Sequence, residues 1–247
     1  MKRNCSHCQS QIDVPEGSAC PNCGSIPTVE CPEIAMPVRT GKYPVRLVLG
    51  FQIDRTGSSL EFEKGIAAAS GIVLKAVQET VQQVVVSVGT HGDLDCGERY
   101  MSLVGQATPD EALEAIRGIR YEGGGDAEET HGDGIETALE SMAWSSDPMS
   151  RNVLAVFLTA DSKDMKDGMS FADLGKRFVT RRIKLVVVCQ PTARLRELCE
   201  NAQGQMIEMS NDPSEDELRK VAKILTKTLT IVATTGKTVP LQSASVA

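Results

Sequence analysis

The sequence has few aromatic residues, no long apolar run and no excess of basic charge. Aromatic residues make up only 4% of the 247 residues, so a core must be built mainly from aliphatic side chains. No stretch approaches the ~18 apolar residues that define a candidate membrane span, so we expect no membrane contact. Acidic residues outnumber basic ones by 33 to 26, opposite to the basic surface typical of nucleic-acid-binding proteins. We therefore do not expect a nucleic-acid partner.

The first residues also lack the apolar stretch of a secretory signal peptide. We therefore expect a cytoplasmic protein with reduced thiols. In that compartment, closely spaced pairs of cysteines indicate metal ligands in preference to disulfides.

Composition divides the chain into three segments. Residues 1–40 are rich in Cys, Pro, Ser and Gly and show almost no periodic apolar pattern, so this segment needs a metal or another cross-link to fold. Residues 41–233 alternate short β-branched runs with helical patterns, which predicts a second domain. Residues 234–247 have no pattern, and we expect them to form a flexible tail.

The N-terminal segment contains two Cys-x-x-Cys pairs, Cys5 with Cys8 and Cys20 with Cys23. Eleven residues separate the pairs, and four thiolates can surround one Zn²⁺ tetrahedrally. Four protein ligands leave no open position, so we expect this zinc to be structural. A redox dithiol is the alternative, but a redox Cys-x-x-Cys opens a helix beside a βαβ unit, and neither pair does. The segment resembles a zinc ribbon.

The second segment predicts an α/β domain with a doubly wound, mostly parallel sheet and helices on both faces. Nearly continuous apolar runs are typical of parallel strands that are covered on both sides. We expect such strands at Val45–Ile53, Val84–Val88, Val153–Leu158 and Ile183–Val188, a weaker one at Gln205–Met209 and an edge strand at Arg99–Val104. Helical stripes are expected over residues 62–77, 109–119 and 134–144, and after a capping box formed by Ser214 and Glu217.

Three acidic loops follow elements of this predicted sheet. Asp54, Thr56 and Ser58 alternate directly after the first strand, Asp126 follows three glycines, and Asp161 follows the run that ends at Leu158. Ligand sites of open parallel sheets lie at the carboxyl ends of the strands. One carboxylate with two hydroxyls is a partial shell suited to Mg²⁺ or Mn²⁺. Each element alone has a plainer interpretation: Asp54 as a helix cap, and the glycines as an ordinary loop.

These motifs together resemble a von Willebrand factor A (vWA) domain with a metal-ion-dependent adhesion site. Asp54-x-Thr56-x-Ser58 is similar to the family's DxSxS motif, with Thr in place of the usual first Ser, and Gly123 to Asp126 is similar to the GGGD branch. The resemblance assigns the third loop to Asp161, with Asp164 in reserve, because Ala160-Asp161-Ser162 departs from the usual Thr-Asp-Gly. It implies a Rossmann-like fold preceded by the zinc ribbon.

The same resemblance implies a function. It points to a non-enzymatic module that binds a partner protein through a divalent cation, Mg²⁺ or alternatively Mn²⁺ or Ca²⁺. Bacterial cytosolic vWA proteins that resemble this one work beside MoxR-type AAA+ ATPases, which suggests that class of partner.

Other interpretations remain open at this stage. Asp54-Arg55-Thr56-Gly57-Ser58 also resembles the phosphorylation loop of haloacid-dehalogenase-like phosphotransferases, with Asp54 as nucleophile. His91 and His131 have no second ligand at metal spacing, so we expect ordinary loop histidines. Basic residues from Lys176 to Lys184 cluster at a predicted helix end, where positive charge complements the helix dipole. A solvated helix end is the first interpretation of this cluster and a partner-docking patch the second.

Overall fold

The computed structural model describes residues 3–4, 11–12, 42–125, 128–210 and 213–235. The chain divides into two compact units, Met1–Thr40 and Gly41–Ala247. In the first unit, β1 (Arg3–Asn4) pairs with β2 (Gln11–Ile12) in an antiparallel arrangement. The four cysteines of the predicted zinc ribbon lie outside the described residues, as do Asp126 and residues 236–247 of the predicted tail.

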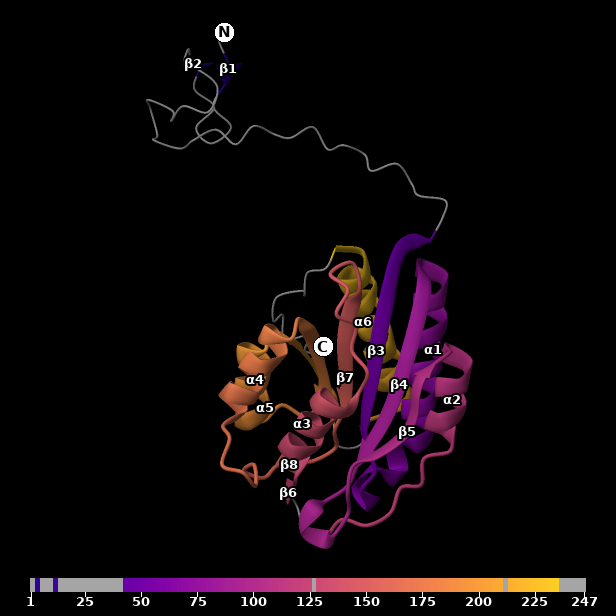
Figure 1. Ribbon diagram of the computed structural model, residues 1–247, viewed down its shortest axis with the longest axis vertical. Helices are drawn as coiled ribbons and strands as arrows, with labels where there is room; N and C mark the ends of the chain where they lie inside the picture. Colours follow the sequence, from indigo (N-terminus) through magenta and orange to yellow (C-terminus); the bar gives the residue numbers. More distant parts are fainter. Residues whose placement is uncertain (1–2, 5–10, 13–41, 126–127, 211–212, 236–247) are drawn as a thin grey trace. The chain divides into compact units, whose positions relative to one another are not determined.

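The second unit is built on a six-stranded sheet with the order β10-β9-β7-β3-β4-β5 (Figure 1). Five strands run parallel, and β5 joins the edge in the antiparallel direction. The predicted fold class is therefore confirmed, including the edge strand. The bounds are β3 (Tyr43–Asp54), β4 (Val81–His91), β5 (Met101–Ala107), β7 (Arg151–Phe157), β9 (Ile183–Cys189) and β10 (Gln205–Glu208).

Helices cover both faces of this sheet (Figure 1). One face packs on α1 (Glu63–Thr80), α2 (Pro109–Arg117) and α6 (Glu215–Thr235). The other packs on α3 (His131–Ser141), α4 (Phe171–Thr180) and α5 (Ala193–Asn201). Two 3₁₀ helices, η1 (Gly57–Phe62) and η2 (Leu94–Cys96), follow β3 and β4, and a short parallel pair joins β6 (Glu128–Glu129) to β8 (Asp161–Ser162).

The core is aliphatic, as the low aromatic content predicts. Along β3, alternate residues from Leu47 to Ile53 are fully buried against α1 and α6. On the opposite face, Leu154 and Val156 of β7 pack toward α3 and α4. Burying a side chain of this size contributes about 1.5–3 kcal/mol, which makes the central strands a firm support for the residues that follow them.

Two helix ends differ from the sequence prediction. Helix α3 begins at His131, three residues before the expected start, which places this histidine in the first turn. Before α6, the backbone N–H of Glu217 donates to Ser214 Oγ at 3.3 Å, as a capping box requires. The Glu217 carboxylate, however, accepts hydrogen bonds from the backbone and hydroxyl of Ser210 instead. This side chain therefore ties the loop after β10 to the helix.

Within the part of the chain that the structure describes, no helix combines the length and the apolar composition needed to cross a membrane.

Candidate metal centre

The carboxylate of Asp54 lies at the carboxyl end of β3, where the chain turns into η1. This residue is fully buried, with 0% of its surface exposed. Its Oδ1 accepts hydrogen bonds from the backbone N–H and the hydroxyl of Thr56, at 2.9 and 2.8 Å. Its Oδ2 lies 3.0 Å from Ser59 Oγ and 2.9 Å from Thr159 Oγ1. Because β3 and β7 are neighbours in the sheet, their ends bring Asp54 and Thr159 together.

Four hydroxyl groups at this point share too few protons for all of their close approaches. They belong to Thr56, Ser58, Ser59 and Thr159. Thr56 Oγ1 lies 3.0 Å from Ser58 Oγ, and Thr159 Oγ1 lies 3.2 Å from Ser58 Oγ and 2.8 Å from Ser59 Oγ. Three more close contacts join these hydroxyls to the Asp54 carboxylate, which makes six oxygen–oxygen contacts in all. Only four protons, one from each hydroxyl, are available to bridge them. At least two oxygen pairs therefore face each other without a proton, an arrangement that a cation would stabilise.

Two buried histidines lie beside Asp54. His91 is the last residue of β4 and pairs in register with Asp54, while His131 opens α3. Their rings meet edge to face, with His91 Nε2 2.9 Å from His131 Nδ1. Gln52 Nε2 lies 2.9 Å from His91 Nδ1, so the amide donates to that nitrogen and the His91 proton is assigned to Nε2. The expectation that these are unconnected loop histidines is wrong.

The electrostatics leave one negative charge in this cluster. Burial raises the pKa of Asp54, but His131, His91 and the hydrogen bonds from Thr56 lower it by more, so the net pKa falls below its ordinary value. Burial and the neighbouring His131 lower the pKa of His91 to about 3. Burial also lowers the pKa of His131, against the opposing influence of Asp54. The ionised form of the Asp54 carboxylate is therefore favoured, while burial disfavours a charged imidazole at either histidine.

Asp54, His91 and His131 could hold a metal ion together. One ligand atom from each lies within 4.8 Å of the other two, and all three residues are buried. Among the described residues, no ion pair joins Asp54 to a lysine or an arginine. A buried charge without a cationic partner is costly in a protein interior. A divalent cation would compensate it, and carboxylate, hydroxyl and imidazole groups are all suitable ligands.

The glycine loop that precedes Asp126 packs against the same turn. Gly57 N–H donates to the Gly123 carbonyl at 3.1 Å, and Gly124 N–H donates to Glu98 Oε1 at 2.9 Å. Gly124 has φ = 74°, and a Cβ there would lie 3.4 Å from the Cβ of Thr56. The positive φ favours glycine at this position, and the loop backbone lies within van der Waals range of Thr56. Asp126 itself lies outside the described residues, so its predicted role as a ligand stays a prediction.

The loop after β7 contributes a hydroxyl to the Asp54 cluster. Thr159 supplies that contact, while the carboxylate of Asp161 accepts a hydrogen bond from the Ser162 N–H at 2.7 Å. Asp164, the reserve candidate, is exposed and forms an ion pair with Arg194 at 3.0 Å. Sequence reasoning identified the loop but not Thr159. The predicted ligand role of Asp161 remains a prediction.

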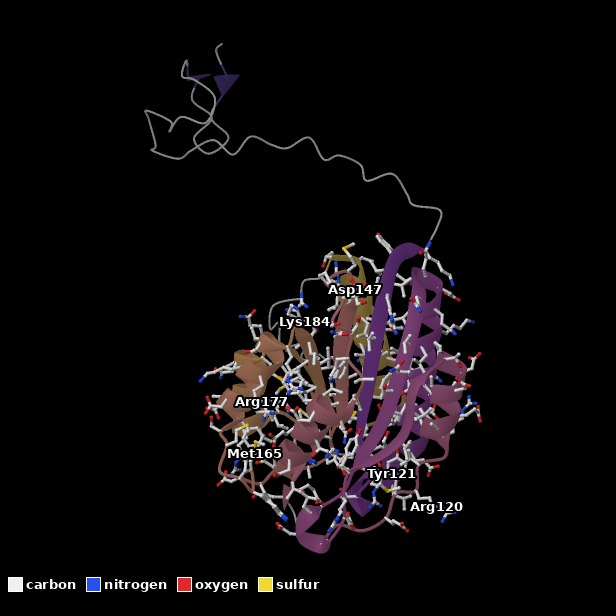
Figure 2. The ribbon with its side chains drawn as sticks, viewed as in Figure 1. Arg120, Tyr121, Asp147, Met165, Arg177 and Lys184 are labelled. Atoms are coloured by element: carbon white, nitrogen blue, oxygen red, sulfur yellow. The ribbon has the colours of Figure 1, made fainter. Side chains whose placement is uncertain are left out.

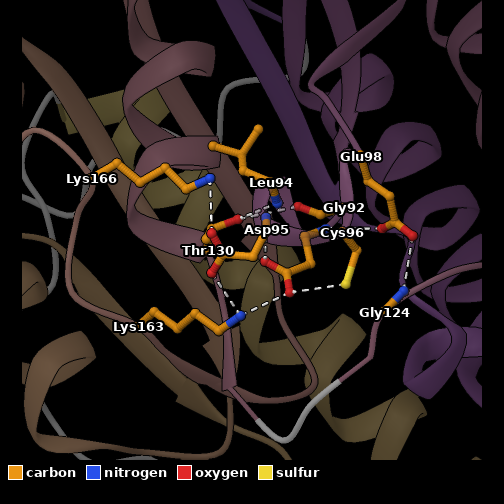
Figure 3. Close-up of polar contacts among 10 residues, drawn as sticks. Gly92, Leu94, Asp95, Cys96, Glu98, Gly124, Thr130, Lys163 and Lys166 are labelled. Atoms are coloured by element: carbon orange, nitrogen blue, oxygen red, sulfur yellow. Dashed lines mark hydrogen bonds and ion pairs between the residues drawn. The ribbon is translucent and has the colours of Figure 1, made fainter.

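A cluster of acidic and basic side chains fastens the neighbouring loops to each other (Figure 3). Lys163, after β8, bridges the buried Asp93 at 2.8 Å and the exposed Asp95 at 3.0 Å. Lys166 contacts Asp95 from the same side, also at 3.0 Å. Burial raises the pKa of Asp93, but the hydrogen bonds from Lys163 and from the Asp95 N–H, with the positive charge of Lys163, together lower it by more, so the net pKa is below the usual range. The charge of Asp93 is thus already compensated, which makes it a structural residue of these loops.

Solved structures resemble this fold. The vWA domain of SpRpn10 matches with a TM-score of 0.58 at 12% sequence identity, over 73% of this chain and 95% of that domain. The chain has a vWA fold. Proximal thread matrix protein 1 from the mussel byssus matches with a TM-score of 0.57 at 14% identity, over 77% of this chain and 47% of that protein, so this chain spans about half of that protein's length. No protein-family model and no curated protein matches the sequence.

Proposed function

We propose that this chain is a non-enzymatic protein-interaction module that binds its partner through a divalent cation at Asp54. One observation carries the proposal: a buried carboxylate sits among oxygen atoms that share too few protons. The vWA fold supports it, because vWA domains commonly mediate protein interactions. Within that fold, the run from Gly123 to Asp126 supports placement in the GGGD branch.

The ligand set combines described residues with residues known from sequence alone. Asp54, Thr56 and Ser58 would hold the ion, with Thr159 beside them, and the sequence adds Asp126 and Asp161. A bound cation would supply a coordination position for an oxygen atom of the partner. The oxygen-rich face favours Mg²⁺, with Mn²⁺ or Ca²⁺ as alternatives. The histidine pair is a specific reason to include Mn²⁺, since imidazole ligands suit transition ions.

Metal titration of the purified protein tests this proposal. We expect saturable binding of Mg²⁺ or Mn²⁺ by isothermal titration calorimetry, and its loss in Asp54→Asn. Asp147→Asn is the matched control, because Asp147 is an acidic residue at the opposite end of the sheet (Figure 2). Equal binding by wild type and Asp54→Asn would contradict the proposal, as would the absence of saturable binding.

The N-terminal segment adds a structural zinc to the proposal. Two Cys-x-x-Cys pairs, at 5–8 and 20–23, support it by their spacing. Metal analysis should find one zinc per chain, lost in Cys20→Ser and retained in Asp54→Asn. Zinc content that is unchanged in the cysteine variant would refute the assignment.

The partner class rests on the sequence resemblance alone. We propose a protein partner of the MoxR-type AAA+ ATPase class, in the cytoplasm. Affinity capture in the presence of Mg²⁺ or EDTA would show whether an ATPase of this class binds in a metal-dependent way. Capture that is indifferent to EDTA and to Asp54→Asn would contradict a partner contact through the metal.

The phosphotransferase alternative finds no support in the structure. The acidic motif that it requires after a strand, Gly132-Asp133-Gly134, lies instead in the first turns of α3. Its chemistry also needs a cation to neutralise phosphate, and the nearby Lys163 is bound to Asp93 and Asp95.

A further inference from the structure

The basic cluster between residues 176 and 184 separates into two groups in the structure. Lys176, Arg177 and Arg181 form ion pairs with acidic side chains of α3 and α4. Arg177 and Arg181 thus join α4 to α3, whereas the Lys176 pair lies within α4. Arg182 and Lys184, which follow at the turn into β9, do not join these ion pairs.

Arg182 and Lys184 line a hollow at the opposite end of the sheet from Asp54. Its volume is about 270 Å³, and Arg151, the first residue of β7, lines it as well. Figure 2 shows Lys184 and Asp147 at this end of the domain. Ligand pockets for drug-sized molecules start at about 300 Å³, so a hollow of this size suits a small ligand.

The three cations of the hollow have no carboxylate partner among the described residues. Arg151 Nη1 donates to three backbone carbonyls at 3.3–3.4 Å, and its buried Nε lacks a hydrogen-bond partner. Arg182 Nη2 donates to a backbone carbonyl of the same loop at 3.3 Å. Asp147 is the acidic residue of the lining, and its Oδ1 accepts the backbone N–H of Met149. The hollow is therefore positively charged, although the chain carries a net charge of −7.

The loop opposite the cations is held in place before any ligand binds. Asn152, which is 6% exposed, accepts the Ser145 N–H at 3.1 Å and donates to the Ser145 carbonyl at 2.8 Å. Ser145 Oγ lies 3.0 Å from Ser150 Oγ. Val179 and Val232 form an apolar wall beside this polar one. A preformed site loses less conformational entropy on binding.

We propose that this hollow binds a small phosphate monoester. Arg151, Arg182 and Lys184 would contact the dianionic phosphoryl group, since guanidinium and ammonium groups donate strong, charge-assisted hydrogen bonds to phosphate. Val179 and Val232 would contact the organic part. This site is separate from the metal centre and independent of the proposed interaction function.

Titrations with inorganic phosphate and phenyl phosphate test the proposal, in EDTA-treated buffer so that no divalent cation contributes. We expect saturable binding of both probes, with phenyl phosphate the tighter because of the apolar wall, and amide shifts in a ¹⁵N spectrum confined to residues 145–152 and 178–184. Lys184→Met should weaken binding at least about tenfold, the effect of losing one charge-assisted contact. Lys176→Met is the matched control, because this lysine already pairs with Asp173 on the helix surface.

Four results would overturn the proposal. If neither inorganic phosphate nor phenyl phosphate binds saturably, the hollow is not a phosphate site. Equal loss in Lys184→Met and Lys176→Met shows a nonspecific charge effect. Binding to a phosphoserine peptide without binding to phenyl phosphate assigns the surface to a macromolecular partner. Asp54→Asn should bind both probes as wild type does, and loss of binding in that variant would place the phosphate at the metal centre instead.

Discussion

Replacing Thr159 by valine tests whether the Thr159 hydroxyl serves metal binding or only stabilises the fold. Valine keeps the branched shape of this largely buried residue and removes its Oγ1. In the metal-free protein, the change deletes the hydrogen bond to Asp54, which is worth about 1.5–3 kcal/mol for a charged acceptor. It also removes the close contacts of Thr159 Oγ1 with the hydroxyls of Ser58 and Ser59, which compete for the same protons. Three hydroxyl protons then serve three remaining distances, so every one can become a hydrogen bond.

The relief of that competition offsets part of the lost bond. We expect the metal-free free energy of unfolding to fall by less than about 1.5 kcal/mol, the lower end of the range for such a bond. A bound cation does not benefit from the reduced competition for hydroxyl protons, and it loses the neighbouring oxygen atom, Thr159 Oγ1. We expect its affinity to fall at least about tenfold, which lowers the metal-dependent stabilisation by about 1.4 kcal/mol at saturating metal.

Urea unfolding with and without Mg²⁺ or Mn²⁺ measures both terms, and Thr159→Ser, which keeps the hydroxyl, is the control. A loss above about 3 kcal/mol without metal, with no additional loss when metal is present, would refute the reasoning. In that case the hydroxyl would be an ordinary structural donor.

Three further substitutions or conditions test the surroundings of the site. Gly134→Ala places a Cβ 2.5 Å from the buried His91 ring, so we expect about 1–3 kcal/mol lower stability by urea unfolding, whereas Gly105→Ala, with no neighbouring atom within 4 Å, should lack this steric loss. The pKa of His91 is lowered to about 3, so between pH 6.5 and 3 this ring is protonated in the unfolded chain but not in the folded chain. The free energy of unfolding should therefore fall by up to about 1.4 kcal/mol for each pH unit of acidification. A free energy of unfolding that does not change with pH over this range would contradict a buried neutral ring. Lys163→Met leaves the buried Asp93 without its cation and should cost about 3 kcal/mol, a loss that the double variant with Asp93→Asn should largely cancel.

The sheet could be predicted from the sequence because its strands are buried on both faces. The run 153–158 is apolar without interruption and the run 183–188 is interrupted by Lys184 alone, a pattern that few other elements produce in a domain of this length. The end of a helix is less well determined, because the first turn needs no periodic apolar residue. For this reason the apolar pattern predicts that α3 starts after His131 and leaves this histidine in a loop.

The meeting of the two histidines depends on the order of the strands. His91 lies beside Asp54 only because β4 is the neighbour of β3 and ends in the same register. In the sequence, the run Thr90-His91-Gly92-Asp93 directly follows the apolar strand predicted at Val84–Val88. A polar residue at that position, next to the strand that carries Asp54, is the signal that could have identified it.

The choice between Thr159 and Asp161 shows where sequence patterns stop being informative. Along a strand, side chains alternate between the two faces, so direction follows from position. β7 ends at Phe157, and the alternation does not extend to the residues that reach the site. From there, the direction of each side chain is set by contacts of the loop, such as the β6–β8 pairing at Asp161. A motif can therefore locate the loop that supplies a ligand, while the atom that faces the cation is determined by tertiary packing.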